Sequence, residues 1–412
     1  TIARKKNLRG GQGVLAGVPT RALKELRGTE KLETHVLGIE QSNTAITYGQ
    51  QLFLKLFRRL ENGINTDAEI TRFLNEETTF RNTPRLAGTI EYRAEGSDAP
   101  TTAAILQGYT PNSGDAWAYT LDSIGRYYDK LLSDAEAVGR ISRAIPTGSV
   151  VALAQRPLPE IARETIGSYL KDAELLGVRS AQMHLALASR EDIPAFAPEP
   201  FTPHYQRSIY QLLRTQIVQT LQMARRRARD SPELEALLTI EDALHQQIRT
   251  VLNGKVDAER IRVHGDYHLG QVLYTGNDFV IIDFEGEPAR PLSERRLKRS
   301  ALKDVAGMLR SFHYAPYAVA YGTAPGSYVR TEDLSRLEAG ARFWHQWVSA
   351  AFLRSYLAES GKGKHLPSRP EAVETLLKAY LIEKALYEIV YELNNRPDWV
   401  KIPVRGLLEL VG

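Results

Sequence analysis

The sequence predicts an α+β protein with a small β-rich lobe near the N-terminus and a larger helical lobe after it. In residues 36–108, apolar and polar residues alternate in short runs separated by turn residues, which is typical of antiparallel strands. From residue 115 onward the chain consists mainly of long segments with helical periodicity. Residues 261–285 interrupt this helical part with two short apolar runs and acidic turns, which predict a β-hairpin.

Length and composition are those of an ordinary globular chain. Its 412 residues are 43% hydrophobic and 25% charged, enough for two or three folding units with full-sized cores. The absence of cysteine excludes disulfides and thiolate metal sites. The net charge is +4, and the densest basic run, residues 224–229, suits a helix end better than a nucleic-acid surface. Because no apolar run could span a bilayer and no leader is visible, we expect a cytoplasmic protein.

Three segments are expected along the chain. Residues 1–35 indicate a basic helix-like stretch, a Gly-rich loop and a short helix; residues 36–108 form the β-rich lobe and residues 109–412 the helical lobe. The Gly-rich RGGQGVLAG follows no predicted strand and lacks the full GxGxxG spacing, so we expect a flexible loop there. In the β-rich lobe, NTDAEITRFLNEE predicts a helix with Thr66 as N-cap and Glu69 completing a capping box. The Pro-rich and acidic residues 190–203 predict a linker.

The acidic turns of the hairpin carry the candidate chemistry. They lie in VHGDYHLGQVL and IIDFEGEP, where a turn normally contains Gly, Asn or Ser. Phosphoryl transfer needs a carboxylate that holds the acceptor hydroxyl, and oxygen ligands for Mg²⁺. In the lobe order of bilobal protein-kinase-like folds, Asp266 takes the catalytic position. The candidate metal ligands are Gln271, Asp283 and Glu285. A solvated hairpin is the alternative, but it does not account for the full set.

Two histidines bracket Asp266. On a loop, His264 and His268 lack the helical face that makes a pair four residues apart a metal site. We therefore expect both to orient the loop through hydrogen bonds, and His268 is also a candidate contact for the acceptor.

The β-rich lobe contains one lysine within an apolar strand. An unpaired ammonium there would be costly, so Lys55 in LFLKLFRRL needs an anionic partner. Glu69 on the following helix is the expected partner, and Glu76 is the second choice.

Further nucleotide contacts are expected at two turns of this lobe. The strand–turn–strand EQSNTAITYG offers hydroxyl, amide and backbone donors to the phosphates from Ser42, Asn43 and Thr44. The strand end ILQGYTP is expected to expose backbone groups at Gln107 and Tyr109 that can read the adenine edge. An ordinary strand exit is the alternative at this second position.

Five stretches together resemble bacterial maltokinases: EQSNTAITYG, LKLFRRLENGINTDAEITRFL, LQGYTPNSGDAW, HGDYHLGQVL and IDFEGEPARPLSERRLKRSALKDVAGMLRSF. The resemblance extends from residue 36 to the end of the chain. It implies an aminoglycoside-phosphotransferase-type fold, ATP and Mg²⁺ as cofactors, and transfer of phosphate to the anomeric hydroxyl of maltose for α-glucan synthesis.

The start of the chain departs from the maltokinase pattern. Maltokinases carry a full N-terminal cap domain, whereas about 35 residues precede the β-rich lobe here. In many bacteria the kinase is fused behind a trehalose synthase. We therefore expect residues 1–35 to be a remnant of the cap or a fusion junction, with trehalose synthase as a covalent or associated partner.

A late helix, residues 371–395, carries an aromatic stripe beside its apolar one. Tyr380, Lys384, Tyr387 and Tyr391 recur about one turn apart and share one side. The resemblance implies that Lys384, Tyr387 and Tyr391 line the maltose pocket; the alternative is a half-buried helix whose tyrosines reach solvent. Two alternatives remain open for the function: the same fold acting on an aminoglycoside or choline, and a pseudokinase that binds without catalysis.

Overall fold

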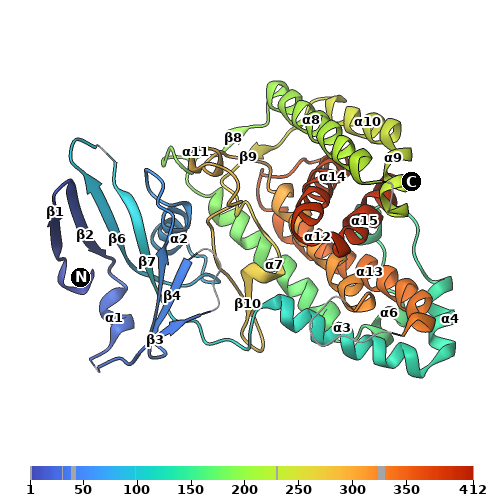
Figure 1. Cartoon of the computed structure of the whole chain (residues 1–412), viewed down its shortest axis with the longest axis horizontal. Helices are drawn as coiled ribbons and strands as arrows, with labels where there is room; N and C mark the ends of the chain where they lie inside the picture. Colours follow the sequence, from blue (N-terminus) through green and yellow to red (C-terminus); the bar gives the residue numbers. More distant parts are fainter. Residues whose placement is uncertain are drawn as a thin grey trace. The chain divides into compact units, whose positions relative to one another are not determined.

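The computed structural model describes residues 2–29, 31–38, 43–97, 99–228, 231–322 and 330–411. The chain forms two compact units (Figure 1). Unit 1 comprises Thr1–Gly114, His264–Asp266 and Gln271–Leu297, and unit 2 comprises Asp115–Val263, Tyr267–Gly270 and Lys298–Gly412. The predicted α+β class is confirmed, because a β-sheet dominates unit 1 and helices dominate unit 2.

Unit 1 is built on a seven-stranded antiparallel sheet with the strand order β1-β2-β6-β7-β5-β4-β3. A separate two-stranded hairpin, β10–β11, belongs to the same unit. The elements of unit 1 are η1 (Ile2–Arg4), β1 (Asn7–Gly10), β2 (Gly13–Pro19), α1 (Leu23–Arg27), β3 (Thr34–Leu37), β4 (Asn43–Tyr48), β5 (Leu52–Phe57), α2 (Thr66–Glu76), β6 (Leu86–Ala94), β7 (Thr101–Gly108), β10 (Val272–Tyr274), β11 (Phe279–Ile281) and α11 (Leu292–Arg295).

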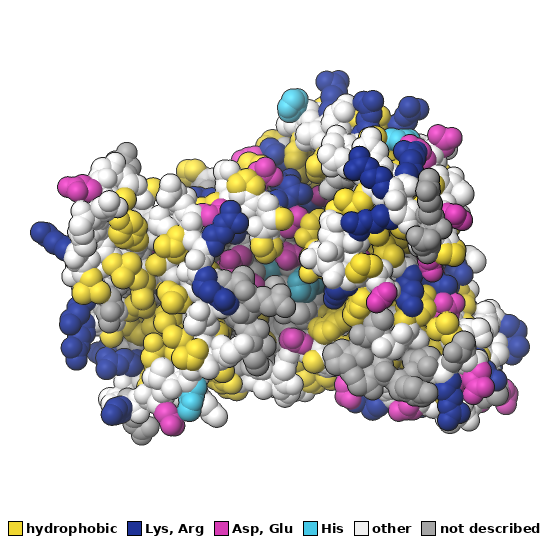
Figure 2. Space-filling model, in the orientation of Figure 1, with side chains coloured by type: hydrophobic (Ala, Val, Ile, Leu, Met, Phe, Trp, Pro, Cys, Tyr) yellow, Lys and Arg dark blue, Asp and Glu magenta, His cyan; other side chains and the backbone are white. Residues whose placement is uncertain are grey.

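The alternation of side chains along the strands divides the core of unit 1 into two clusters. Leu52 and Leu54 of β5 lie in one cluster, with residues from η1 and α1. Phe57 lies in the other cluster, together with Ala68 of α2. Because successive residues of a strand point to opposite faces, Lys55 shares the face of Phe57, which α2 covers. Figure 2 shows hydrophobic side chains gathered on the visible face of this sheet.

At the N-terminus the expected helix-like stretch is limited to the short turn η1, and the expected short helix is confirmed as α1, but the expectation of a flexible loop is wrong. Residues 7–19 form the β1–β2 hairpin, and β2 pairs with β6 along its whole length, from Gly13↔Ala94 to Pro19↔Gly88. The backbone hydrogen bonds of this Gly-rich stretch are made with β6, which lies far along the chain. No local sequence pattern predicts this pairing. The origin of this segment as a cap remnant or a junction remains a prediction.

Unit 2 contains the long helices. Its elements are α3 (Ala116–Ser133), α4 (Ala135–Arg143), α5 (Val150–Ala154), α6 (Glu160–Thr165), α7 (Tyr169–Leu187), β8 (Glu199–Pro200), α8 (Pro203–Arg227), α9 (Pro232–Thr239), α10 (Glu241–Arg249), η3 (Thr250–Leu252), β9 (Glu259–Arg260), α12 (Leu302–Ala320), η5 (Thr331–Asp333), α13 (Leu334–Ser360), α14 (Pro370–Asn395), η6 (Pro397–Trp399) and α15 (Lys401–Val411). The short η4 (Leu269–Gln271) begins in unit 2 and ends in unit 1.

The core of unit 2 is organised around α12, which is buried along almost its entire length and contacts α3, α13, α14 and α15. This burial follows from its sequence, which is apolar on nearly all sides. The segment 190–203, expected as a linker, lies inside unit 2 instead: Phe196 and Phe201 are buried, and Phe201 N donates to Ala258 O (2.9 Å). The described helices include none with the length and apolarity needed to traverse a bilayer.

The predicted β-hairpin at residues 261–285 is confirmed as β10–β11. It follows a long helical stretch in the sequence, but it packs with unit 1, since Ile281 N donates to Asn82 O (2.8 Å) and the Asn82 side chain donates to Phe279 O (2.8 Å). The hairpin thereby brings the acidic turns of residues 264–266 and 283–287 into the same unit as Lys55.

Candidate active site

Lys55 is the centre of the charged cluster in unit 1. Its strand β5 directs it toward α2, and the side chain is 7% exposed. The Lys55 ammonium lies 2.5 Å from Oδ1 of Asp283 and also pairs with Oε1 of Glu285. The third carboxylate is that of Asp67, with Oδ2 3.8 Å away. The buried ammonium thus has three carboxylate partners. This confirms the prediction that a lysine within an apolar strand is paired with an anionic side chain.

Asp67 takes the role that sequence reasoning gave to Glu69. It lies at the start of α2, whose N-cap is Asn65, with Asn65 Oδ1 accepting from Asp67 N (2.8 Å). The predicted N-cap, Thr66, is instead the first helical residue, and its hydroxyl donates to Glu285 O (2.8 Å). Asp67 Oδ1 accepts hydrogen bonds from Phe284 N (3.1 Å) and from a threonine one turn later.

A signal for Asp67 was present in the sequence but was missed. Asp67 falls on the same helical stripe as Ile70, Thr71 and Leu74, all of which are buried. A carboxylate on the buried stripe of a helix must be paired. Assigning the N-cap one position too late concealed this placement.

The expected Lys55–Glu69 ion pair is therefore wrong. Glu69 lies on the other side of α2, where it binds the guanidinium of Arg296. Glu76, the second choice, is exposed. Residues 67 and 69 are about 200° apart around a helix, so only one of them can face β5.

Backbone geometry brings the two acidic turns together. Asp283 has a φ of 65°, a left-handed conformation that is uncommon for a non-glycine residue and that tends to occur at functional sites. The loop at Gly265 packs tightly against Gly286, because a Cβ on Gly265 would lie 3.1 Å from Gly286 Cα. Glycine at residue 265, which also has a φ of 88°, allows this approach. The strand backbone before Asp283 is fixed by Ile282 N donating to Gln271 O (3.0 Å).

His264 orients the loop that carries Asp266, as predicted. Its Nδ1 accepts from Asp266 N (3.4 Å), so its Nε2 carries the proton and donates to Ile282 O (2.8 Å). This one ring connects the loop of Asp266 to the strand end before Asp283. His268 lies in unit 2, where its Nδ1 accepts from Gly270 N (3.1 Å). Its expected contact with the acceptor remains a prediction.

The electrostatics of the cluster follow from burial and mutual attraction. Burial alone would lower the pKa of Lys55, but Asp283, Asp67 and Glu285 outweigh it and raise that pKa well above its usual value. Burial raises the pKa of Asp67 to about 7 and also raises the pKa of Glu285. Burial acts on Asp283 in the same direction, but Lys55 dominates and holds the pKa of Asp283 low, against the negative charge of nearby Asp266.

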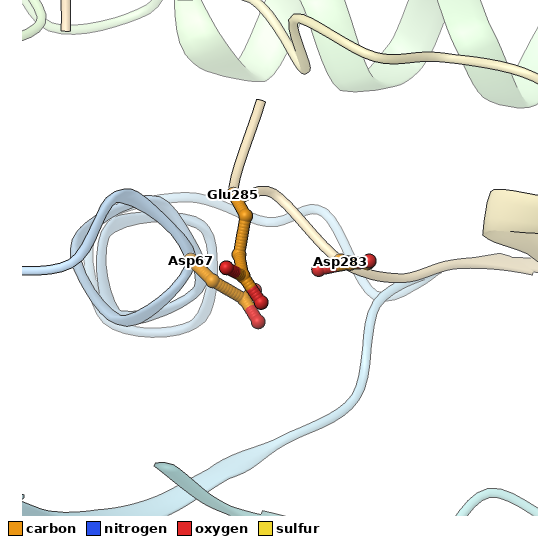
Figure 3. A group of neighbouring side chains, drawn as sticks. All are labelled: Asp67, Asp283 and Glu285. Atoms are coloured by element: carbon orange, nitrogen blue, oxygen red, sulfur yellow. The ribbon is translucent and has the colours of Figure 1, made fainter. Parts of the chain in front are cut away.

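The residues present fit a hard divalent cation. Asp67, Asp283 and Glu285 each offer a carboxylate oxygen, and these oxygens lie within 4.8 Å of one another. Figure 3 shows the side chains of Asp67, from α2, and Glu285 directed toward one another, with Asp283 beside them on the loop. Carboxylate oxygens are the ligands that Mg²⁺ prefers. Asp283 and Glu285 thus lie where metal ligands were expected, while Asp67 is held by α2 and bonded to Phe284 N. The assignment of Gln271 as a further ligand remains a prediction.

The expected phosphate contacts are described in part. Ser42 lies outside the described residues. Asn43 is buried, and its side-chain amide donates to Glu285 Oε1 (3.1 Å), so it contacts the acidic cluster directly. Thr44 is half-buried in β4 opposite Leu56. The assignment of these residues to the phosphates remains a prediction.

The expected adenine edge is less open than the sequence indicated. Gly108 N donates to Arg85 O (2.7 Å) and Tyr109 N donates to Gln51 O (2.8 Å), so these two donors are used within unit 1. The side chain of Gln107 is buried. The expectation that Tyr109 exposes a free backbone donor is therefore wrong, because its N–H donates to Gln51 O just beyond the end of β7. Adenine binding beside residues 105–111 stays a prediction.

The aromatic stripe of α14 is formed as predicted. Tyr387 and Tyr391 stack with ring centroids 6.4 Å apart, and the Lys384 ammonium lies 5.0 Å from the Tyr387 centroid. Tyr391 is 44% exposed, whereas Tyr380, at the other end of the stripe, is buried. Lys384 and Tyr387 are half-buried beside the exposed Tyr391, so these three side chains form one partly accessible stripe of unit 2.

Comparisons with known proteins identify the family of the chain. The sequence profile of the phosphotransferase enzyme family matches residues 38–286. The glucosamine kinase of Streptacidiphilus jiangxiensis is 24% identical over 343 residues, which cover 81% of this chain and 62% of that protein. The glucosamine kinase of Mycolicibacterium smegmatis is 31% identical over 150 residues, covering 36% of this chain and 34% of that protein. The chain thus spans less than two thirds of the length of these curated relatives.

Solved structures give the same fold. A glucosamine kinase in complex with glucosamine, ADP and inorganic phosphate superposes with a TM-score of 0.66 at 20% identity, covering 98% of this chain and 94% of that one. A second crystal form of glucosamine kinase gives a TM-score of 0.65 at 19% identity, covering 99% and 91%. The fold is therefore kinase-like, and the family profile covers well over half of the chain. The chain belongs to the phosphotransferase enzyme family.

Proposed function

We propose that this chain is an ATP- and Mg²⁺-dependent sugar kinase that converts maltose to maltose 1-phosphate. The observation that carries the kinase part of the proposal is the cluster in unit 1, where Lys55 is surrounded by Asp67, Asp283 and Glu285. Membership in the phosphotransferase enzyme family supports the same reaction class. The sequence resemblance to maltokinases supports maltose as the acceptor.

Each residue of the cluster has a proposed role. Lys55 binds the nucleotide phosphates, and Asp67 holds Lys55 in place from α2. Asp283, Glu285 and Gln271 would hold Mg²⁺, which supplies positive charge to the transferring phosphoryl group. The Asp283 carboxylate, whose pKa is held low by Lys55, is ionised at neutral pH and so suited to a cation.

Asp266 is the proposed catalytic base. It accepts the proton of the acceptor hydroxyl while the hydroxyl oxygen forms a bond to the γ-phosphorus. The bond from the γ-phosphorus to the bridging oxygen breaks, and ADP leaves with that electron pair. His264 positions the loop that carries Asp266 through its two hydrogen bonds.

The accessible stripe of α14 favours a neutral sugar as the acceptor. Tyrosine rings can cover the C–H faces of a sugar, while the hydroxyls and the Lys384 ammonium bond to its oxygens. The neighbouring carboxylates of the same helix already have cationic partners: Glu383 binds Lys303, Glu388 binds Arg310 and Glu392 binds Arg396.

Glucosamine is the second candidate acceptor, because the curated relatives are glucosamine kinases. Its ammonium group requires a carboxylate that is not neutralised. Since the three carboxylates just named are engaged, maltose is the better match to this helix. In that role, a fused or associated trehalose synthase would be the source of maltose.

A coupled assay of ADP release tests this proposal. Mg-ATP is supplied with maltose, glucosamine, glucose, trehalose, an aminoglycoside or choline. We expect the kcat/KM for maltose to exceed that for glucosamine by about 100-fold, and mass spectrometry to detect a disaccharide monophosphate. A preference for glucosamine would contradict maltose as the acceptor but support kinase activity. No ADP release with any acceptor would favour the pseudokinase alternative.

A further inference from the structure

A cavity of about 440 Å³ lies among α5, α12, α13, α14 and α15, entirely within unit 2. This volume is within the range of small-molecule sites, roughly 300–1,000 Å³. The residues that line it, all in the described part of unit 2, do not include Lys384, Tyr387, Tyr391 or His268. The cavity is therefore separate from the proposed acceptor surface.

Several buried polar atoms around this cavity have no hydrogen-bond partner within the described residues. They are both ring nitrogens of His313, Nδ1 of His345, Oε1 of Gln346 and Oγ of Ser349. His313 and Ser349 are each only 1% exposed. The carboxylate of Glu409 lies 3.8 Å from His313 Nε2, beyond hydrogen-bond distance. An unsatisfied buried polar atom costs about 1–3 kcal/mol, so such a group of atoms around one cavity indicates a ligand that completes their bonding.

The surrounding helices aim these side chains at the cavity. His345 and Ser349 are four positions apart on α13 and share one face, with Gln346 beside them. Arg310 of α12 is held from its far side by two hydrogen bonds to Glu388 Oε2 (2.9 and 2.7 Å), which fixes its guanidinium.

Close packing of α15 completes the wall next to Arg310. A Cβ on Gly406 would lie 2.1 Å from Arg310 Nη1 and 2.9 Å from His313 Cε1. Glycine at this helical position therefore lets α15 approach these two side chains. The cavity runs from these buried groups to exposed residues such as Thr147 and Arg342.

The chemistry of the walls selects the kind of ligand. Burial, and then the positive charge of Arg310, lower the pKa of His313 well below its usual value, and the same causes lower the pKa of His345 to about 3. Both rings are neutral at pH 7, so each has one donor and one acceptor. Gln346 Oε1 accepts and Ser349 Oγ does both. A ligand that satisfies them all must carry groups that both donate and accept, as hydroxyls do.

The charged residues of the lining have both signs and largely offset one another, which favours a neutral ligand over a strongly charged one. Arg310, Arg342 and Lys378 are basic, and Glu374 and Glu409 are acidic. Apolar surface comes from Val151, Leu377 and Leu381 and suits the C–H faces of a ring.

We propose that this cavity binds a small neutral polyhydroxylated molecule, a free sugar of one or two rings. It would be a second sugar site, in addition to the proposed acceptor surface. The observation behind it is the convergence of His313, His345, Gln346 and Ser349 on one cavity. The proposal does not depend on which sugar is phosphorylated.

Binding is tested by saturation-transfer NMR in a Tyr387→Ala background, which weakens the acceptor surface but leaves the cavity intact. The probes are glucose, maltose and trehalose as neutral sugars, with glucosamine, glucose 6-phosphate and inorganic phosphate as charged ones. We expect at least one neutral sugar to bind, and Gln346→Met with Ser349→Ala to weaken it by ~10-fold or more. Gln211→Met, the same chemical change on the exposed side of α8, is the matched control and leaves binding unchanged.

Thermal unfolding gives a second readout that a purely structural role would not produce. Without sugar, the Gln346→Met, Ser349→Ala chain is at least as stable as its parent, because buried atoms without partners have been removed. The sugar that binds raises the Tm of the parent and not that of the double variant. The proposal is overturned if no neutral sugar binds, if binding is insensitive to the double variant, or if only the charged probes bind.

Discussion

The Lys55 ammonium lies 2.5 Å from Oδ1 of Asp283, although 228 positions separate the two residues in the chain. The residue proposed to bind phosphates is thus paired directly with a residue proposed to bind Mg²⁺. Nucleotide binding must exchange this contact for new ones, since the ammonium and a cation compete for the same oxygen. In the free protein the ammonium offsets only part of the negative charge of the three carboxylates around it.

Removal of the ammonium is expected to destabilise unit 1. Lys55→Met leaves the buried carboxylate of Asp67 and the half-buried carboxylates of Asp283 and Glu285 without their cation, which costs about 3–5 kcal/mol of the free energy of unfolding. Urea unfolding measures this loss, and Mg²⁺ should restore more stability to the variant than to the wild type. The exposed Lys24→Met is the control. A change below about 1 kcal/mol would show that the cluster does not rely on Lys55.

Asp67 and Glu69 offer a matched pair of variants. Asp67→Asn removes one of the three charges that hold Lys55 and is expected to lower kcat/KM for ATP by about 10-fold or more. Glu69→Gln removes the charge that pairs with Arg296, on the side of α2 away from Lys55, and should stay within about threefold of wild type. The reverse order of effects would return the phosphate-binding role to Glu69.

The features that could be predicted were those with a local pattern. The apolar run of β5 identified Lys55 as a lysine that needs an anionic partner, and the acidic turns of β10–β11 identified Asp283 and Glu285. Asp67 was missed because its pairing depends on the exact start of α2, and caps are the least certain part of a helix.

Features that depend on distant pairing could not be predicted. The strands β1 and β2 exist because β6 lies beside them, and their Gly-rich sequence has weak strand propensity. The hairpin joins unit 1 through Asn82, which lies nearly 200 positions before Phe279 in the sequence. The donors of Gly108 and Tyr109 bond to Arg85 and Gln51, which lie just before β6 and β5, and no local motif reveals these contacts.

Substitutions in the aromatic stripe of α14 should change the KM for the acceptor and not the KM for the nucleotide. Tyr387→Ala and Tyr391→Ala are expected to raise the KM for maltose by about 10-fold or more, because stacking surface is lost, while the KM for ATP stays nearly constant. Tyr210→Ala, a half-buried tyrosine on α8, is the control. If the KM for maltose does not move, α14 is scaffold and the sugar binds elsewhere.

The free energy of unfolding is expected to decrease as the pH decreases, because unit 2 contains a buried histidine that is neutral in the folded state. His365 is fully buried, neither ring nitrogen has a described partner, and burial together with His184 lowers its pKa to about 3. Its folded pKa is depressed, so the folded state favours the neutral ring. The neutral ring therefore contributes fully to the free energy of unfolding above the usual histidine pKa of about 6.5. This contribution is lost as the pH falls below that value.

The pH dependence of His365→Gln tests this expectation. Between about pH 7.5 and pH 5.5 the wild type should lose about 1.4 kcal/mol more free energy of unfolding than the variant, since only the wild type gains that proton on unfolding. Parallel pH curves for the two proteins would mean that His365 is protonated or partnered in the folded state.

The catalytic claim rests on Asp266, and one measurement tests it most directly: maltose-dependent ADP release by Asp266→Asn, with Mg-ATP affinity recorded on the same sample. The asparagine keeps the loop and its hydrogen bond to His264 but cannot accept the acceptor proton. The account predicts a loss of turnover of roughly 10²–10⁴-fold with Mg-ATP affinity unchanged. Turnover within about threefold of wild type would contradict it, because the proton would then be leaving by a route that does not involve Asp266.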